Sequence, residues 1–189
     1  MIQDSRSSIQ DRAGFTLIEL LVSVTVTALL SSFVIVYTTS GRAQTALYVE
    51  QSKVIQVIVR AKSLAISTYD APAPLCGYGV HFDPDAGTYD LFSYRSLDCV
   101  HISFIDPDAS ANYVSLHRYL LPQNLMLRDG EDAIRDVLFI PPDPKTLLWK
   151  ESEGVLIPIE RGAGKVYLAA KNGPWSSDLQ VSVAGQISF

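Results

Sequence analysis

A single carboxylate inside a long apolar run is the feature of this sequence with the clearest chemical meaning. Between Phe15 and Tyr37, Glu19 is the only charged residue, and Lys, Arg, Asp, Gly and Pro are absent. A carboxylate at the centre of a membrane helix costs about 2.5–3.5 kcal/mol, and less near an end. A residue kept at such a cost normally has a partner, so we expect Glu19 to have a partner and a role.

The apolar run is long enough to cross a membrane. As a helix, residues 15–39 would measure roughly 37 Å, against about 30 Å for a bilayer core. A secretory signal peptide is shorter, with an apolar region of about 7–15 residues before a site of small residues. Arg6 and Arg12 precede the run and favour a cytoplasmic leader, although Arg42 on the far side weakens this preference. The sequence predicts a single span with the remainder of the chain outside the cytoplasm.

Residues 14–22, Gly-Phe-Thr-Leu-Ile-Glu-Leu-Leu-Val, resemble the signature of type IV prepilins. The resemblance implies that a prepilin peptidase cuts between Gly14 and Phe15 and then N-methylates the new amine of Phe15. Gly14 has no side chain, so the backbone can approach a protease closely in extended form. In the filament that the resemblance implies, Glu19 of one subunit meets the Phe15 amine of its neighbour and sets the axial register. Such a pair is far less costly in an apolar core than either charge alone.

The remainder of the chain predicts an α+β head. Apolar residues recur at spacings of three, four and seven over 43–68, which indicates an amphipathic helix, and Pro72 and Pro74 end it. Alternating segments follow, with turn residues between them, and residues 83–88 predict the turn of a hairpin between 79–82 and 89–94. We expect strands at 79–82, 89–94, 100–104, 114–121, 137–140, 146–149, 155–158, 165–170 and 179–189. The resemblance implies a pilin fold: a long N-terminal helix, with its first half in the membrane, packed on an antiparallel sheet. The predicted parts are a cleaved leader (1–14), a transmembrane and filament-core helix (15–39), the amphipathic half of that helix (40–70) and a β-rich head (71–189).

Cys76 and Cys99 are the only cysteines, and they fit no zinc pattern. Outside the cytoplasm a disulfide between them is favoured over two buried free thiols. Such a disulfide would close a loop of about 22 residues and add roughly 3 kcal/mol to the free energy of unfolding.

Other groups of polar residues in the head predict no enzyme chemistry. The spacings of His81, His101 and His117 define no metal geometry. The acidic turn formed by residues 83, 85 and 90 is better explained as a solvated loop than as a calcium site. The Gly-Ala-Gly-Lys stretch at 162–165 lacks the rest of a phosphate loop and predicts a turn before a strand. We therefore expect a structural protein without catalytic residues, metal or cofactor.

The resemblance points to a minor pilin or pseudopilin of a pilus or type II secretion pseudopilus. No Pro or Gly occurs near residue 36, where many major pilins have Pro, and the hairpin, the 139–144 stretch and the last strands resemble the H-type pseudopilin and FimT-like group. Implied partners are prepilin peptidase, other pilins or pseudopilins, the inner-membrane assembly platform, and membrane lipid before assembly. The implied location is the cytoplasmic (inner) membrane, with the head outside, and then a periplasmic or extracellular filament. The alternative is a tip subunit of a DNA-uptake or adhesive pilus, but the net charge of −5 and the scattered Lys and Arg residues disfavour DNA.

Overall fold

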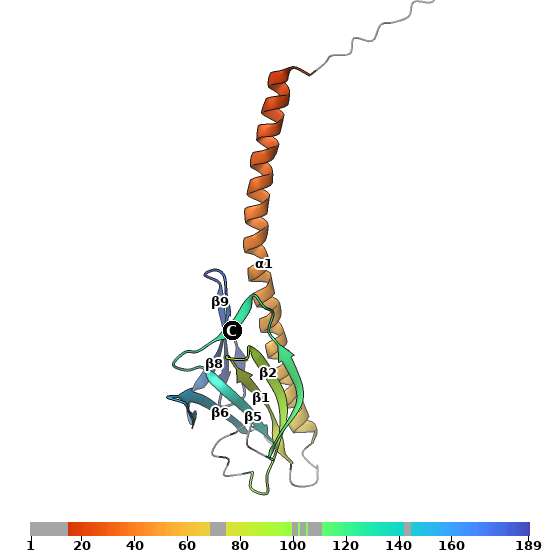
Figure 1. The fold of residues 1–189 in the computed structure, drawn as a ribbon. Coiled ribbons are helices and arrows are strands. Elements are labelled where there is room, and N and C mark those ends of the chain that lie inside the picture. The colour runs from red at the N-terminus through yellow and green to blue at the C-terminus, as the bar shows by residue number, and fades with distance from the viewer. Residues whose placement is uncertain (1–14, 69–74, 100–101, 103–104, 106–110, 142–144) are drawn as a thin grey trace, which may run out of the picture. The chain divides into compact units, whose positions relative to one another are not determined.

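The computed structural model describes residues 15–68, 75–99, 102, 105, 111–141 and 145–189, with only the backbone for residues 36–40 (Figure 1). The chain divides into two units, Met1–Gly41 and Arg42–Phe189. One helix, α1 (Leu17–Ser67), contributes residues to both.

In the first unit, α1 is apolar all round its circumference. The stretch Leu17–Ile35 has a mean hydropathy of 2.1, and none of it is buried against other parts of the chain. Its length and composition suffice to cross a membrane. This is the pattern of a single-pass membrane anchor.

In the second unit, α1 buries one stripe and exposes the opposite face. Leu47, Val54, Ile58, Ala61 and Ala65 are at most 2% exposed, and they recur at spacings of seven, four, three and four. This is the periodicity of a helix with one face on a core. The stripe predicted from the sequence is therefore confirmed.

A six-stranded antiparallel sheet packs on this stripe. Its strand order is β3-β2-β1-β5-β6-β7. The β1–β2 and β5–β6 pairs near its centre are hairpins formed by consecutive strands. The strands are β1 (Leu75–Asp83), β2 (Thr88–Arg95), β3 (Tyr113–Leu120), β5 (Ile134–Ile140), β6 (Lys145–Ser152) and β7 (Val155–Pro158). The predicted β1–β2 hairpin is confirmed, with Asp83 opposite Thr88 at its turn.

A second, four-stranded antiparallel sheet completes the head, in the order β10-β9-β8-β4. Its strands are β4 (Leu125–Arg128), β8 (Ala163–Ala170), β9 (Ser176–Ser182) and β10 (Ile187–Ser188). The sequence did not predict β4, and the strand expected over 179–189 was wrong because Gly185, at φ +70°, turns the chain between β9 and β10. Of the strand expected at 100–104, the structure describes only Ile102, which lies in no strand.

The helix and both sheets share one apolar core. Ile58 and Ala61 of α1 belong to the same buried cluster as Val80 of β1, Phe139 of β5 and Leu168 of β8. The head is thus an α+β unit in which a helix packs on antiparallel sheet, as predicted, and the fold is consistent with that of a pilin (Figure 1).

The shared core predicts a large stability difference between two adjacent helix positions. Ile58 is fully buried, whereas Val59 is 49% exposed. Ile58→Ala should lower the free energy of unfolding by about 2–5 kcal/mol because it leaves a cavity between helix and sheets. Val59→Ala, the matched control, should change it by no more than about 0.5 kcal/mol. Denaturant titration of the detergent-solubilised protein, followed by fluorescence of the buried Trp149, measures both. Equal losses would contradict the packing described here.

Candidate functional site

The N-terminal site is built around the first turn of α1. Gly14 lies outside the described residues, and Phe15 is 79% exposed. The helix begins at Leu17, directly after Thr16. The Thr16 hydroxyl oxygen accepts a hydrogen bond of 3.3 Å from the backbone N–H of Glu19. Thr16 therefore caps the helix and satisfies one of its free N–H groups.

Thr16 and Glu19 have the spacing of a capping box, a role that the sequence analysis missed. In this motif a Ser or Thr cap is followed three residues later by Glu or Gln. The signal was present in the string Thr16-Leu17-Ile18-Glu19. A carboxylate in the first turn is also favoured by the partial positive charge of the helix N-terminus. Glu19 thus stabilises the start of its own helix in addition to any role between subunits.

A ridge of small hydroxyl residues continues from Glu19 along the apolar helix. Ser23, Thr27 and Ser31 follow at intervals of four, and residues at this spacing are neighbours on a helix surface. Each hydroxyl donates to the carbonyl oxygen four residues earlier, at 2.7, 2.9 and 2.8 Å respectively. These hydroxyls therefore need no hydrogen-bond acceptor outside the helix, and their short side chains form a ridge that stands little above the helix surface. Small residues of this kind let helices approach closely in membranes.

The sequence model of the prokaryotic N-terminal methylation motif matches residues 9–35. The N-terminal segment of this chain is that of a type IV prepilin-like protein. The match covers the predicted cut site, Glu19 and the apolar helix and none of the head, so it supports a pilin-like filament subunit without specifying a subgroup. No curated protein and no solved structure matches the chain.

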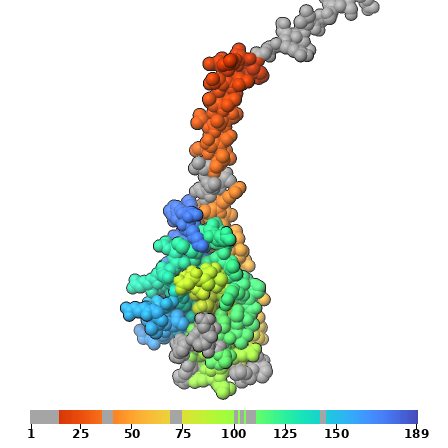
Figure 2. Space-filling view, in the orientation of Figure 1, coloured from red at the N-terminus to blue at the C-terminus, as the bar shows by residue number. Residues whose placement is uncertain are grey.

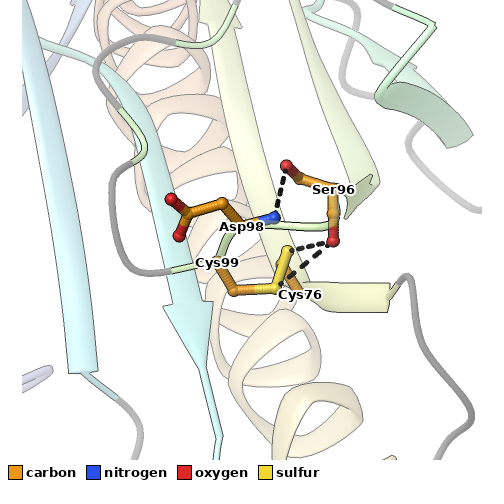
Figure 3. Close-up of a disulfide and its surroundings, with 4 residues drawn as sticks. All are labelled: Cys76, Ser96, Asp98 and Cys99. Carbon is orange, nitrogen blue, oxygen red and sulfur yellow. Dashed lines mark hydrogen bonds between the residues drawn. A yellow bond between two sulfur atoms is a disulfide. The ribbon is translucent and has the colours of Figure 1, made fainter.

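The head of the prepilin-like protein contains one disulfide, between Cys76 and Cys99 (Figure 3). Their Cα atoms are 5.2 Å apart, within the usual range for a disulfide. Both sulfur atoms face the Ser96 carbonyl oxygen, and the Asp98 backbone N–H donates to the Ser96 hydroxyl at 3.2 Å. The bond ties the segment after β2 to the beginning of β1.

This disulfide lies at the edge of a second apolar cluster, on the face of the six-stranded sheet opposite α1. The cluster contains Phe92, Leu138 and Trp149 from the sheet, together with Cys76 and Ile105. Ile105 and Trp149 are 0% and 1% exposed. The segment that follows the disulfide therefore contributes a fully buried residue to the cover of this face.

The histidines do not form a metal site among the described residues. His81 lies on β1, His117 is exposed on the edge strand β3 with its ring against Tyr119, and His101 lies outside the described residues. In the described part of the chain, no group of three His, Cys, Asp or Glu residues is placed to hold a metal ion. In the acidic turn, Asp83 accepts a hydrogen bond from the Ala86 backbone N–H at 2.9 Å.

A charged row crosses four neighbouring strands on the face opposite α1. Arg118 of β3, Asp90 of β2, His81 of β1 and Asp136 of β5 are successive cross-strand partners. Arg118 donates to both carboxylate oxygens of Asp90, from Nε at 2.9 and 3.1 Å and from Nη2 at 2.8 Å. His81 Nδ1 lies 2.8 Å from Oδ1 of Asp136, whose side chain is completely buried. The row could not be predicted from His81 and Asp90 taken separately in the sequence, because it depends on strand register.

Burial and charge shift the protonation of this row. Burial raises the pKa of Asp136, and the bond to His81 offsets this only in part. Burial by itself lowers the pKa of His81, but the hydrogen bond and charge of Asp136, with the charges of Asp83 and Asp90, outweigh it and leave the pKa above 6.5. Burial also raises the pKa of Tyr113, which lies over His81 with their ring centroids 6.4 Å apart. Hence the folded pair holds protons more tightly than the unfolded chain.

The row predicts that the head is stabilised at acidic pH. When the folded pKa exceeds the unfolded one, the folded state binds more protons, so the free energy of unfolding falls as pH rises. For His81 the stabilisation is complete below 6.5 and is lost as pH rises through the higher folded pKa. The raised pKa of Asp136 acts in the same direction, starting from its ordinary value of 3.8.

The measurement is the free energy of unfolding from about pH 5 to about pH 8.5. The double variant His81→Gln with Asp136→Asn keeps hydrogen-bonding groups of similar shape and should flatten the decline. His117→Gln, which removes an exposed histidine, should leave the decline unchanged. A decline of equal size in the double variant would show that the pair does not cause it.

Proposed function

We propose that the mature protein is a minor pilin or pseudopilin of a type IV filament machine, cut between Gly14 and Phe15 and N-methylated on Phe15. The observation that carries this proposal is the methylation motif at residues 9–35, with one carboxylate at a fixed place in an otherwise apolar helix. Its partners are prepilin peptidase, the other pilins of the filament and the inner-membrane assembly platform. Before assembly it is a single-pass protein of the cytoplasmic membrane with its head outside.

The proposed role of Glu19 is to pair with the Phe15 amine of a neighbouring subunit. Cleavage would create an ammonium group at the start of a helix whose surface is otherwise apolar. In a filament core, an unpaired ammonium or carboxylate is strongly disfavoured, and a pair in contact is much less so. Because only one carboxylate occurs between Phe15 and Ile35, only one axial register satisfies both charges. The ridge of Ser23, Thr27 and Ser31 supports close packing on the same helix face.

The ion pairs of the head support a structural role over DNA binding. Phosphate contacts need Lys and Arg side chains that are free to meet them. Arg118 is paired with Asp90, and Lys165 with Asp178 at 3.1 Å. Arg135 is only 13% exposed and lies 2.7 Å from Glu151. These three cations are therefore already matched by carboxylates.

Processing at Gly14 is the first test. Co-expression with a prepilin peptidase should give a chain that begins at Phe15 and carries an added methyl group, as measured by intact mass and N-terminal sequencing. Gly14→Val should block the cut, because a branched side chain keeps the scissile backbone from close approach. Ala13→Ser, one residue upstream, should be processed normally. A mature terminus at any other residue would exclude the prepilin assignment.

Glu19→Gln tests the pairing role separately from the helix cap. Gln can replace Glu in a capping box, so the first helical turn should persist while the charge is lost. The neighbour's ammonium would then be unpaired, at a cost of about 3–5 kcal/mol, so incorporation should fall by at least about a hundredfold. Cleavage should continue, and processed protein should accumulate in the membrane.

The measurement is the amount of this subunit in sheared filaments and in membranes. Ser23→Ala, one turn along the same ridge, is the matched control and should assemble as the wild type does. Normal incorporation of Glu19→Gln would show that the carboxylate does not determine the register.

A further inference from the structure

The β8–β9 hairpin ends in an exposed tip with an unusual composition. Residues 171–175, Lys-Asn-Gly-Pro-Trp, are all exposed, and Trp175 is 36% exposed. The Ala170 backbone N–H donates to the Trp175 carbonyl oxygen at 2.9 Å, which closes the turn. In Figure 2 the tip (blue) projects from the surface of the head. An ordered turn thus holds an indole in a position where the head does not bury it.

A second segment is tied to this tip. The Lys171 backbone N–H donates to the Asn124 carbonyl oxygen at 2.9 Å, and the Leu125 N–H donates to the Pro122 carbonyl oxygen at 2.9 Å. We call residues 122–124 and 171–175 together the tip surface. It has two prolines, one tryptophan, polar amides and one cation.

The tip surface lacks the acidic residues that are common in the rest of the head. The chain has 20 Asp and Glu residues against 15 Lys and Arg. The turn between β1 and β2 carries Asp83 and Asp85, and the turn between β6 and β7 carries Glu153. In contrast, neither 118–128 nor 161–177 contains a carboxylate side chain. The two segments of the tip surface therefore carry no side-chain anion of their own, and the nearest acidic turn is the one before Gly87, whose carbonyl oxygen accepts from the Leu121 backbone N–H.

Chain connectivity limits how far the tip surface can lie from the apolar span. Ala170 and Leu125, which border its two segments, form one buried cluster with Leu47 of α1. Leu47 follows Ile35, the last residue of the span, by only twelve positions. Twelve residues extend about 18 Å as a helix and at most about 43 Å when fully stretched.

We propose that, in the membrane-anchored subunit before assembly, the tip surface rests in the headgroup layer of the same bilayer, with the Trp175 indole at its boundary. Tryptophan is enriched at this depth because its ring is apolar and its N–H is polar. Lys171 adds a cation that can reach lipid phosphate. The inference rests on the proposed membrane anchoring. Contact of the tip surface with lipid would give the head a preferred orientation on the bilayer before the subunit joins a filament.

Quenching by brominated lipid tests this placement. The full-length protein is reconstituted into vesicles of phosphatidylcholine and phosphatidylglycerol whose acyl chains carry bromine near the glycerol end. Trp149 is 1% exposed and provides a constant background, so the difference between wild type and Trp175→Phe isolates the Trp175 signal. That signal should fall severalfold in brominated vesicles and should resist a water-soluble quencher.

A matched control places tryptophan at the other end of the head. Leu97 is 97% exposed and follows Arg95, which pairs with Leu75 at the open end of the β1–β2 hairpin. The turn of that hairpin is at the opposite end, where the Gly87 carbonyl oxygen accepts from the Leu121 N–H beside the tip surface. In the Trp175→Phe background, Leu97→Trp should respond to the water-soluble quencher and not to bromine.

Three outcomes would overturn the inference. A Trp175 signal that is quenched only from water, or that is shielded from both quenchers as by a second protein copy, contradicts lipid contact. Bromine quenching of Leu97→Trp as strong as that of Trp175 would show that the head has no preferred orientation on the bilayer. A protein that does not float with the vesicles would contradict the proposed anchoring itself, together with this inference.

Discussion

One apolar stripe on the second half of α1 is the constraint on which the head depends. The six-stranded and the four-stranded sheet both close on it, and Ala61 and Ala65 keep the helix surface low where they do so. Two polar contacts fix its position against the sheets. Buried Glu50 accepts a 2.9 Å hydrogen bond from the Tyr89 hydroxyl of β2, and Lys62 donates to the Gly185 carbonyl oxygen beside β10 at 3.0 Å. The apolar stripe supplies the free energy of packing, and these two contacts select its register.

The two halves of α1 have different surfaces, as two different environments would require. Through Ile35 its side chains are apolar all round, with hydroxyls bonded internally. Beyond Arg42, a polar face appears and only one stripe remains apolar. An all-round apolar surface has no stable place in water, whereas a charged face has none in lipid. The change of pattern therefore marks where the chain leaves an apolar environment. It could be predicted from the sequence because both halves are helical, so the same helical periodicity shows which faces are apolar in each.

Features formed by residues close together in the chain could be predicted from the sequence, and features formed by distant residues could not. The helix stripe and the β1–β2 hairpin depend on residues close in sequence, so periodicity and turn residues identified them. Strand β4 was missed because its four residues become a strand only by pairing with β8. The same limit hid the charged row, since Asp136 meets His81 only through a pairing 55 positions apart. At the N-terminus the motif predicts Gly14, Phe15 and Glu19 as the site, and this stays a prediction, whereas the cap by Thr16 could be recognised only once the first helical turn was located.

The capping geometry changes how the proposed charge pair should be understood. A new ammonium at Phe15 would lie at the helix N-terminus, where the partial positive charge of the backbone disfavours it. In a subunit cut after Gly14, Glu19 is the nearest carboxylate in sequence, one helical turn away, and a carboxylate in the first turn also interacts favourably with the same helix end. In a filament, a neighbour's carboxylate would then add to an anion already present rather than supply the only one. If Glu19 pairs as proposed, assembly would therefore strengthen an existing compensation of charge and would not begin from a bare ammonium. No step would leave either charge unpaired in lipid, which would lower the barrier to transfer from membrane to filament.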